Sequence, residues 1–338
     1  MRDANQSEAP QDVQAIGVHN GPISGIAASS DGTQLMVANY IHDTVSVIDT
    51  ETWRVVATVA GLNEPFAIAV GAHDNNRAYV STVSPAYDSI GVIDTSTNTV
   101  IAAHPLALSV SDLVVSPDGR HVYASRNGVF GADVAVLDTA TGRVEAIDLP
   151  TQPGTTAECV RISPDGGRLY VATNGPAGGR VVVIGGHRRR VIDTVEIGFP
   201  IRDVALSPDG AIAYAASCAA DWGAVVDIID TRTAKIIGTR KIGEITGILT
   251  GLTLSGDGAR AYLVSDDSVA VLSTHTHDVI RFVAVANQPS CVAESPDAKY
   301  LYIADYSGGV TVARVAPVVA SGAETSALEL RQLQPALA

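Results

Sequence analysis

Residues 113–125 have the sequence LVVSPDGRHVYAS, in which a Ser-Pro-Asp-Gly tetrapeptide separates two segments rich in strand-forming residues. The same tetrapeptide recurs at residues 163–166 and 207–210. Proline fixes φ at the second turn position, aspartate bonds nearby backbone amides, and glycine adopts the left-handed conformation that closes the turn. An aspartate in this setting also has the chemistry of a metal ligand or a catalytic group. The number of copies decides between the two interpretations.

Seven copies of this turn are spaced regularly along the chain. Their aspartates are Asp31, Asp74, Asp118, Asp165, Asp209, Asp257 and Asp297, separated by 43, 44, 47, 44, 48 and 40 residues. A period of this size is typical of β-propeller blades. Because an aspartate that recurs seven times at equivalent positions does not form one active site, we interpret the tetrapeptide as a hairpin turn.

A second turn motif follows the first in each unit. It has the sequence VIDT at residues 47–50 and 92–95, VLDT at 136–139 and IIDT at 228–231. Short segments rich in Val, Ile and Tyr separate the two motifs, without a helical period. Each unit therefore contains four strands. The sequence predicts an all-β, seven-bladed β-propeller over residues 12–315, with a flexible N-terminus (1–11) and a C-terminal tail (316–338) that is flexible or forms a short helix.

The last unit supplies only three strands, near residues 290–294, 300–304 and 309–315. The segment VQAIGV at residues 13–18 precedes the first inner strand in the same way as the outer strands of other units precede theirs. Pairing the two ends of the chain removes the free sheet edges that favour aggregation. We therefore expect the N-terminal strand to complete the last blade.

The units resemble the YVTN repeats of YncE-like and surface-layer propellers. Residues 168–174 have the sequence RLYVATN, residues 43–59 have DTVSVIDTETWRVVATV, and the match covers about residues 12–315. The resemblance implies the propeller fold. Proteins of this kind include nucleic-acid binders, lactonase-like hydrolases, redox subunits and scaffolds, so the fold does not select an activity.

Composition narrows the choice. The net charge of −14 argues against nucleic-acid binding, because phosphate contacts require clustered Lys and Arg. The chain has no apolar run of about 18 residues and its first 12 residues lack a signal-peptide core, so we expect a cytoplasmic protein, associated with a membrane only through a partner. The three cysteines are expected to be buried apolar residues. The preference for Arg over Lys suggests a GC-rich genome, such as that of an actinobacterium.

Polar residues that break the repeat on the inner strands form the first candidate site. They lie near the central channel on three adjacent blades: Asp112, Glu158, Arg202 and Asp203. Carboxylates gathered in this way supply acid/base groups or bind a cation. The alternative, which we favour, is a water-filled channel in which Arg202 pairs with a neighbouring carboxylate.

Loops between the second and third strands form the second candidate. They contribute Tyr40, His42, Tyr87, Asp88, Arg126, Phe130, Asp221, Trp222, Asp266, Asp267 and Tyr306. Aromatic and arginine side chains anchor protein interfaces, so the aromatic residues of this set, with His42 and Arg126, predict a partner-binding rim. The alternative is packing of these loops against neighbouring blades.

On the opposite face, the fourth unit replaces its second turn motif with GGHRRR. Arg188, Arg189 and Arg190 are suited to a phosphate, a lipid headgroup or an acidic partner, or simply form a solvated turn. His275 and His277 show no third ligand, so we expect no metal. The chain lacks HExxH, GxSxG, CxxCH and Walker motifs, and we expect no cofactor.

These observations favour a monomeric, non-enzymatic propeller that acts as an interaction scaffold or accessory subunit. Analogy with stand-alone actinobacterial propellers extends this hypothesis to a cell-envelope complex that exports lipid. The alternative is a lactonase-like hydrolase that uses the four inner-strand residues named above.

Overall fold

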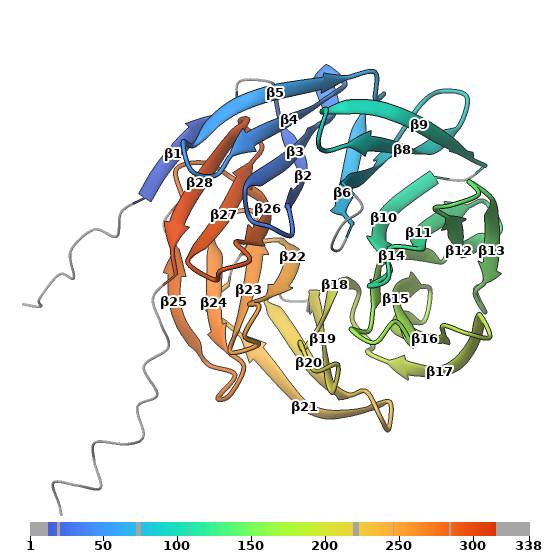
Figure 1. The fold of residues 1–338 in the computed structure, drawn as a ribbon. Helices are drawn as coiled ribbons and strands as arrows, with labels where there is room; N and C mark the ends of the chain where they lie inside the picture. Colours follow the sequence, from blue (N-terminus) through green and yellow to red (C-terminus); the bar gives the residue numbers. More distant parts are fainter. Residues whose placement is uncertain are drawn as a thin grey trace, which may run out of the picture.

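The computed structural model describes residues 13–18, 21–71, 76–107, 109–218, 223–245, 247–283 and 285–315. These residues form seven four-stranded antiparallel sheets arranged in a ring (Figure 1). The seven-bladed β-propeller predicted from the repeat is therefore confirmed. The expected flexible N-terminus (1–11) and the C-terminal tail (316–338) lie outside the described residues.

Blades 1 to 6 each consist of four consecutive strands, ordered from the channel outward. Blades 1 to 3 contain β2 (Ile23–Ala28), β3 (Gln34–Asn39), β4 (Thr44–Asp49), β5 (Arg54–Ala60), β6 (Pro65–Val70), β7 (Arg77–Thr82), β8 (Asp88–Asp94), β9 (Thr99–Leu106), β10 (Ser109–Val115), β11 (His121–Gly128), β12 (Gly131–Asp138) and β13 (Val144–Asp148). Blades 4 to 6 contain β14 (Thr156–Ile162), β15 (Arg168–Gly175), β16 (Gly178–Gly185), β17 (Arg190–Glu196), β18 (Ile201–Leu206), β19 (Ile212–Cys218), β20 (Ala224–Asp230), β21 (Lys235–Ile242), β22 (Leu249–Leu254), β23 (Arg260–Ser265), β24 (Val269–Ser273) and β25 (Val279–Val283). Blade 7 combines β26 (Pro289–Glu294), β27 (Tyr300–Asp305) and β28 (Gly309–Arg314) with β1 (Val13–Gly17). One 3-10 helix, η1 (Tyr40–His42), follows β3.

The recurrent aspartate closes its turn with local hydrogen bonds, as the sequence predicted. In the turn after β10, Ser116 Oγ donates to Asp118 Oδ1 at 2.6 Å, and the N–H of Arg120 donates to the same oxygen at 3.1 Å. Gly119 has φ of 68°. These bonds favour the ionised carboxylate, and the Ser116 bond contributes most to lowering the pKa of Asp118. The aspartate is structural.

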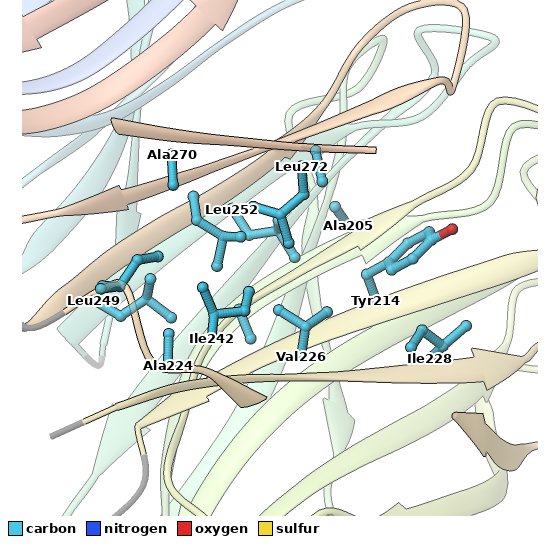
Figure 2. Packing of buried hydrophobic residues seen from close by; sticks show 14 residues of the cluster. Ala205, Tyr214, Ala224, Val226, Ile228, Ile242, Leu249, Leu252, Ala270 and Leu272 are labelled. Atoms are coloured by element: carbon cyan, nitrogen blue, oxygen red, sulfur yellow. The ribbon is translucent and has the colours of Figure 1, made fainter. Parts of the chain in front are cut away.

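The hydrophobic core is divided among the interfaces between blades. Figure 2 shows the cluster between blades 5 and 6, where Tyr214, Val226 and Ile242 pack against Leu249 and Leu252. The second and third strands of each blade are buried on both faces, so they consist of nearly continuous Val, Ile, Ala and Tyr. Each blade is therefore stabilised by both of its neighbours.

Each inner strand carries a register shift at the same point of the repeat. In β10 the shift lies between Val110 and Asp112, and in β18 it lies between Ile201 and Asp203. Such β-bulges redirect side chains and locally increase twist. The repeat thus places Asp112 and Asp203 directly after a bulge.

The N-terminal strand closes the ring. β1 pairs antiparallel with β28, from Val13 opposite Ala313 to Gly17 opposite Gly309. Ile16 of β1 packs in the same apolar cluster as Tyr302 and Val312 of blade 7. The assignment of residues 13–18 as the missing outer strand is confirmed, with β1 ending at Gly17.

Deleting residues 1–18 should leave the outer edge of β28 unpaired and expose the apolar side chains beneath β1. We expect a lower melting temperature and concentration-dependent aggregation, measured by thermal denaturation and size-exclusion chromatography. Deletion of residues 1–10, which keeps β1, is the matched control. A monodisperse 1–18 deletion with an unchanged melting temperature would contradict this role for β1.

Candidate functional site

An arginine joins the two aspartates that the sequence placed near the channel. Asp112 lies on β10, Arg161 on β14 and Asp203 on β18, the inner strands of three successive blades. Arg161 Nη1 is paired with Asp112 Oδ2, and Arg161 Nη2 donates to Asp203 Oδ1 at 2.6 Å. A single guanidinium therefore bridges two carboxylates.

Backbone amides complete the coordination of these carboxylates. The N–H of Val160 donates to Asp112 Oδ2 at 3.1 Å, and the N–H of Leu252 donates to Asp203 Oδ2 at 3.0 Å. Since Leu252 belongs to β22, the network links four inner strands, from blade 3 to blade 6. Burial raises the pKa of Asp203 despite the neighbouring Arg161. Burial also raises the pKa of Cys159, with a further contribution from Asp203, so this thiol is a poor nucleophile.

The structure corrects the expected pairing in this group. Arg202 is exposed at the bulge of β18 and forms no ion pair with any described residue. Glu158 accepts a hydrogen bond from Thr156 Oγ1 at 2.6 Å, not from an arginine. Arg161 pairs with both aspartates instead, because its strand position points its side chain between them. Its sequence signal was available: Arg161 occurs where the other six units have Ala, Val or Thr.

The paired state of these groups bears on catalysis. Asp112 and Asp203 are both engaged by Arg161 and by backbone N–H groups, so their hydrogen-bonding capacity is used within the protein and not directed at a substrate. The hydrolase alternative is therefore not favoured. Within the described part of the chain, no three His, Cys, Asp or Glu side chains gather closely enough to hold one metal ion.

The predicted rim is only partly exposed. Phe130, Tyr87 and Tyr306 are exposed, with 87% of the Phe130 surface accessible, and His42 is also exposed while Tyr40 is half-buried. Trp222 and Asp221 lie outside the described residues. We call the end of the propeller that carries these loops the loop face.

The structure does not support Arg126 as a rim contact. Arg126 is 7% exposed, and its Nε and Nη2 each donate to a different Asp133 oxygen at 2.7 Å. Asp88 of blade 2 accepts the Val110 N–H of blade 3 at 2.9 Å, which links two neighbouring blades as the packing alternative expected. Asp266 accepts the Ile248 N–H at 2.7 Å, which ties its loop to the start of the inner strand of the same blade.

Apolar residues that sequence reasoning missed extend the exposed surface of the loop face. They lie in loops between second and third strands or at the starts of inner strands: Ile41, Phe66, Val129, Phe199 and Ile248. Val129 is 85% exposed and forms, with Phe130, the two-residue turn between β11 and β12. The sequence did contain a sign of this surface, because Val129 and Phe130 are two apolar residues at a hairpin turn, where polar residues are usual.

The basic turn of blade 4 is partly neutralised. Arg189 has φ of 49° and pairs with Glu145 of blade 3. Glu145 also pairs with Arg143 at 3.2 Å. Arg188 and Arg190 are exposed, so the turn presents two cations to solvent.

Seven four-stranded blades closed by an N-terminal strand define the class of seven-bladed β-propellers. No family model matches the chain. The seven-bladed β-propeller protein Rv1057 of Mycobacterium tuberculosis is 56% identical over 366 aligned positions, which cover 96% of this chain and 93% of that protein. The chain therefore belongs to the seven-bladed β-propeller family of this mycobacterial protein.

A solved structure gives the same architecture. Hydrazine synthase of Kuenenia stuttgartiensis superposes with a TM-score of 0.79 and 23% identity, covering 93% of this chain and 99% of that one. This likeness concerns the fold alone. Among the described residues, no helix has the length and apolar character needed to cross a membrane.

Replacing Arg161 with methionine should leave Asp112 and Asp203 without their shared cation. We expect the free energy of unfolding at pH 7 to fall by about 1–3 kcal/mol, less than for a fully buried ion pair, because the three side chains are partly exposed. Burial already raises the pKa of Asp203 in the wild-type chain, and removing the Arg161 cation, which lowers that pKa, raises it further. A carboxyl whose folded-state pKa lies above its unfolded value destabilises the folded chain while it is ionised. Protonation of Asp203 therefore restores stability as the pH falls, and the loss should be smaller at pH 5.

Urea denaturation of Arg161→Met at pH 7 and pH 5 measures both effects. Arg202→Met is the matched control, since Arg202 is exposed, and should change the free energy of unfolding by less than about 0.5 kcal/mol. Equal stability of the two variants at pH 7 would show that the bridge contributes nothing.

Proposed function

We propose that this propeller is a non-enzymatic binding platform that holds a protein partner on its loop face. The observation that carries the proposal is the Val129–Phe130 turn, whose side chains are 85% and 87% exposed. Large apolar side chains exposed to this extent are unfavourable in water, and aromatic anchors that enter a partner's pocket dominate binding free energy.

The hairpin below this turn holds the anchor in position. β11 and β12 pair without interruption from His121 opposite Asp138 to Gly128 opposite Gly131. The bidentate Arg126–Asp133 pair lies two residue pairs below the Gly128–Gly131 pair. A rigid hairpin loses little conformational entropy on binding, so more of the contact energy remains as affinity. Arg126 thus supports the binding surface from within.

The other exposed apolar residues of the loop face widen the surface around this anchor. Phe66, Tyr87 and Phe199 lie at the same end of blades 2 and 5. The net charge of −14 favours a partner with basic residues around its apolar pocket, since complementary potentials speed association.

The finer assignment rests on the sequence pattern. The RLYVATN and VIDT segments support membership of the YVTN-repeat propellers, and the mycobacterial relative supports an actinobacterial setting. In that setting we propose a monomeric cytoplasmic accessory subunit of a cell-envelope complex, such as one that exports lipid, which reaches the membrane through its partner.

In-cell crosslinking with a Val129→Ser/Phe130→Ser double variant tests the platform. We expect the wild-type chain to recover a stoichiometric partner. The amount of partner recovered with the double variant should be at least about tenfold lower, because the anchor contributes most of the affinity. Ile237→Ser is the matched control: Ile237 is exposed on the outer strand β21, away from the loop face.

Recovery should be unchanged in Ile237→Ser, and all three proteins should melt at similar temperatures. Equal recovery by the double variant would place the interface elsewhere. Failure of the wild-type chain to recover any partner would reject the platform.

A further inference from the structure

The end of the propeller opposite the loop face, which we call the turn face, carries a repeated cap. The second turn of each of blades 1 to 6 has a residue with positive φ at one position: Trp53, Asn98, Gly142, Arg189, Ala234 and His277. In two places this residue lies on a tyrosine of the preceding blade: between ring centroids, Trp53 lies 5.9 Å from Tyr302 and His277 lies 6.3 Å from Tyr214. Ala234 packs against the apolar cluster that includes Tyr170.

Between blades 2 and 3 the capping residue is Gly142, which has no side chain. A pocket of about 310 Å³ opens there, lined by Arg77, Tyr79, Ile101, His104, Leu137 and the turn at residues 139–142. The imidazole of His104 reaches under this turn, so that a Cβ at Gly142 would lie 2.8 Å from His104 Cε1. Other residues adopt a positive φ at this position of the other blades, so at Gly142 it is the histidine that requires a glycine.

Two polar groups of the pocket, the Tyr79 hydroxyl and the Arg77 guanidinium, can donate hydrogen bonds to a ligand. Tyr79 is 1% exposed, and its hydroxyl has no hydrogen-bond partner among the described residues. A buried hydroxyl without a hydrogen-bond partner is unfavourable, and a ligand oxygen would supply the missing partner. Among the described residues, Arg77 makes one long hydrogen bond, from Nη1 to the Thr139 carbonyl at 3.4 Å, and a guanidinium has five N–H donors with which to meet a ligand.

The charge of the pocket contrasts with that of the protein. The chain carries a net charge of −14, yet among the residues that the structure describes no carboxylate lines this pocket. Burial lowers the pKa of His104, which favours the neutral ring, and a hydrogen bond with the Gly142 backbone ties that ring to the turn. The remaining wall is apolar, formed by Val92, Ile101 and Leu137.

We propose that this pocket binds a small carboxylate with a compact apolar body. The carboxylate would accept hydrogen bonds from the Arg77 guanidinium and the Tyr79 hydroxyl, while the apolar body packs against Ile101 and Leu137. The volume lies at the lower end of that of ligand pockets, about 300–1,000 Å³, and suits a ring or chain of roughly ten heavy atoms. This site lies at the end of the propeller opposite the loop face, so its test is independent of the test of the binding platform.

Benzoate and hexanoate are suitable probes, measured by ligand-observed NMR and thermal denaturation of the full chain. We expect saturable binding of at least one of them and a rise in melting temperature, because a ligand of the folded state stabilises it. Tyr79→Phe should weaken binding about five- to tenfold through loss of one hydrogen bond, and Arg77→Met by tenfold or more. Benzamide, which lacks the charge, should bind at least about tenfold more weakly than benzoate.

Tyr214→Phe is the matched control, because it removes the equivalent hydroxyl from a groove that His277 covers. Its affinity for the probe should equal that of the wild-type chain. Absence of saturable binding of both carboxylates overturns the proposal. Equal affinity of Tyr79→Phe and Tyr214→Phe, or equal binding of benzamide, overturns the assigned site or the assigned ligand class.

Discussion

Burial between adjacent blades is the constraint on which the rest of the structure depends. Each sheet has two apolar faces and covers them only against its neighbours, so no blade is stable alone and the ring must close. The pairing of β1 with β28 meets this condition by joining the two ends of the propeller in one blade. The regular repeat follows from this geometry, because every blade packs between two neighbours of the same kind and needs apolar residues at the same positions.

Polar residues fix how the blades meet at the ends and along the channel. The Arg161 bridge spans three blades on the inner strands, and Asp88 of blade 2 binds the Val110 N–H of blade 3. These contacts are directional, whereas apolar packing is not, so they set the angle between neighbouring sheets. Several polar residues that break the repeat therefore serve the architecture and not a reaction.

The departures from the repeat that leave unsatisfied surface are the ones suited to binding. Val129 and Phe130 expose apolar area at a hairpin tip, and Gly142 uncovers a groove that larger residues fill elsewhere. In the first place apolar side chains are exposed to water, and in the second a buried hydroxyl has no partner among the described residues. Binding of another molecule would bury the first and provide a hydrogen bond to the second. They lie at opposite ends of the ring, which allows a partner and a small ligand to bind together.

The sequence alone determined the fold, the number of blades and the strand that closes the ring, because turn chemistry and strand periodicity are local and repeat seven times. It also marked Asp112, Asp203 and Phe130 as departures from the repeat. Only the tertiary structure decided that Arg161 and not Arg202 bridges the aspartates, that Arg126 is internal, and that Gly142 opens a pocket over Tyr79. The Arg161 bridge and the Gly142 pocket depend on contacts between blades, more than 40 residues apart for the bridge, and the Arg126 pair depends on which side of a hairpin its side chain takes. The period of one strand carries no information about the side chains of its neighbour.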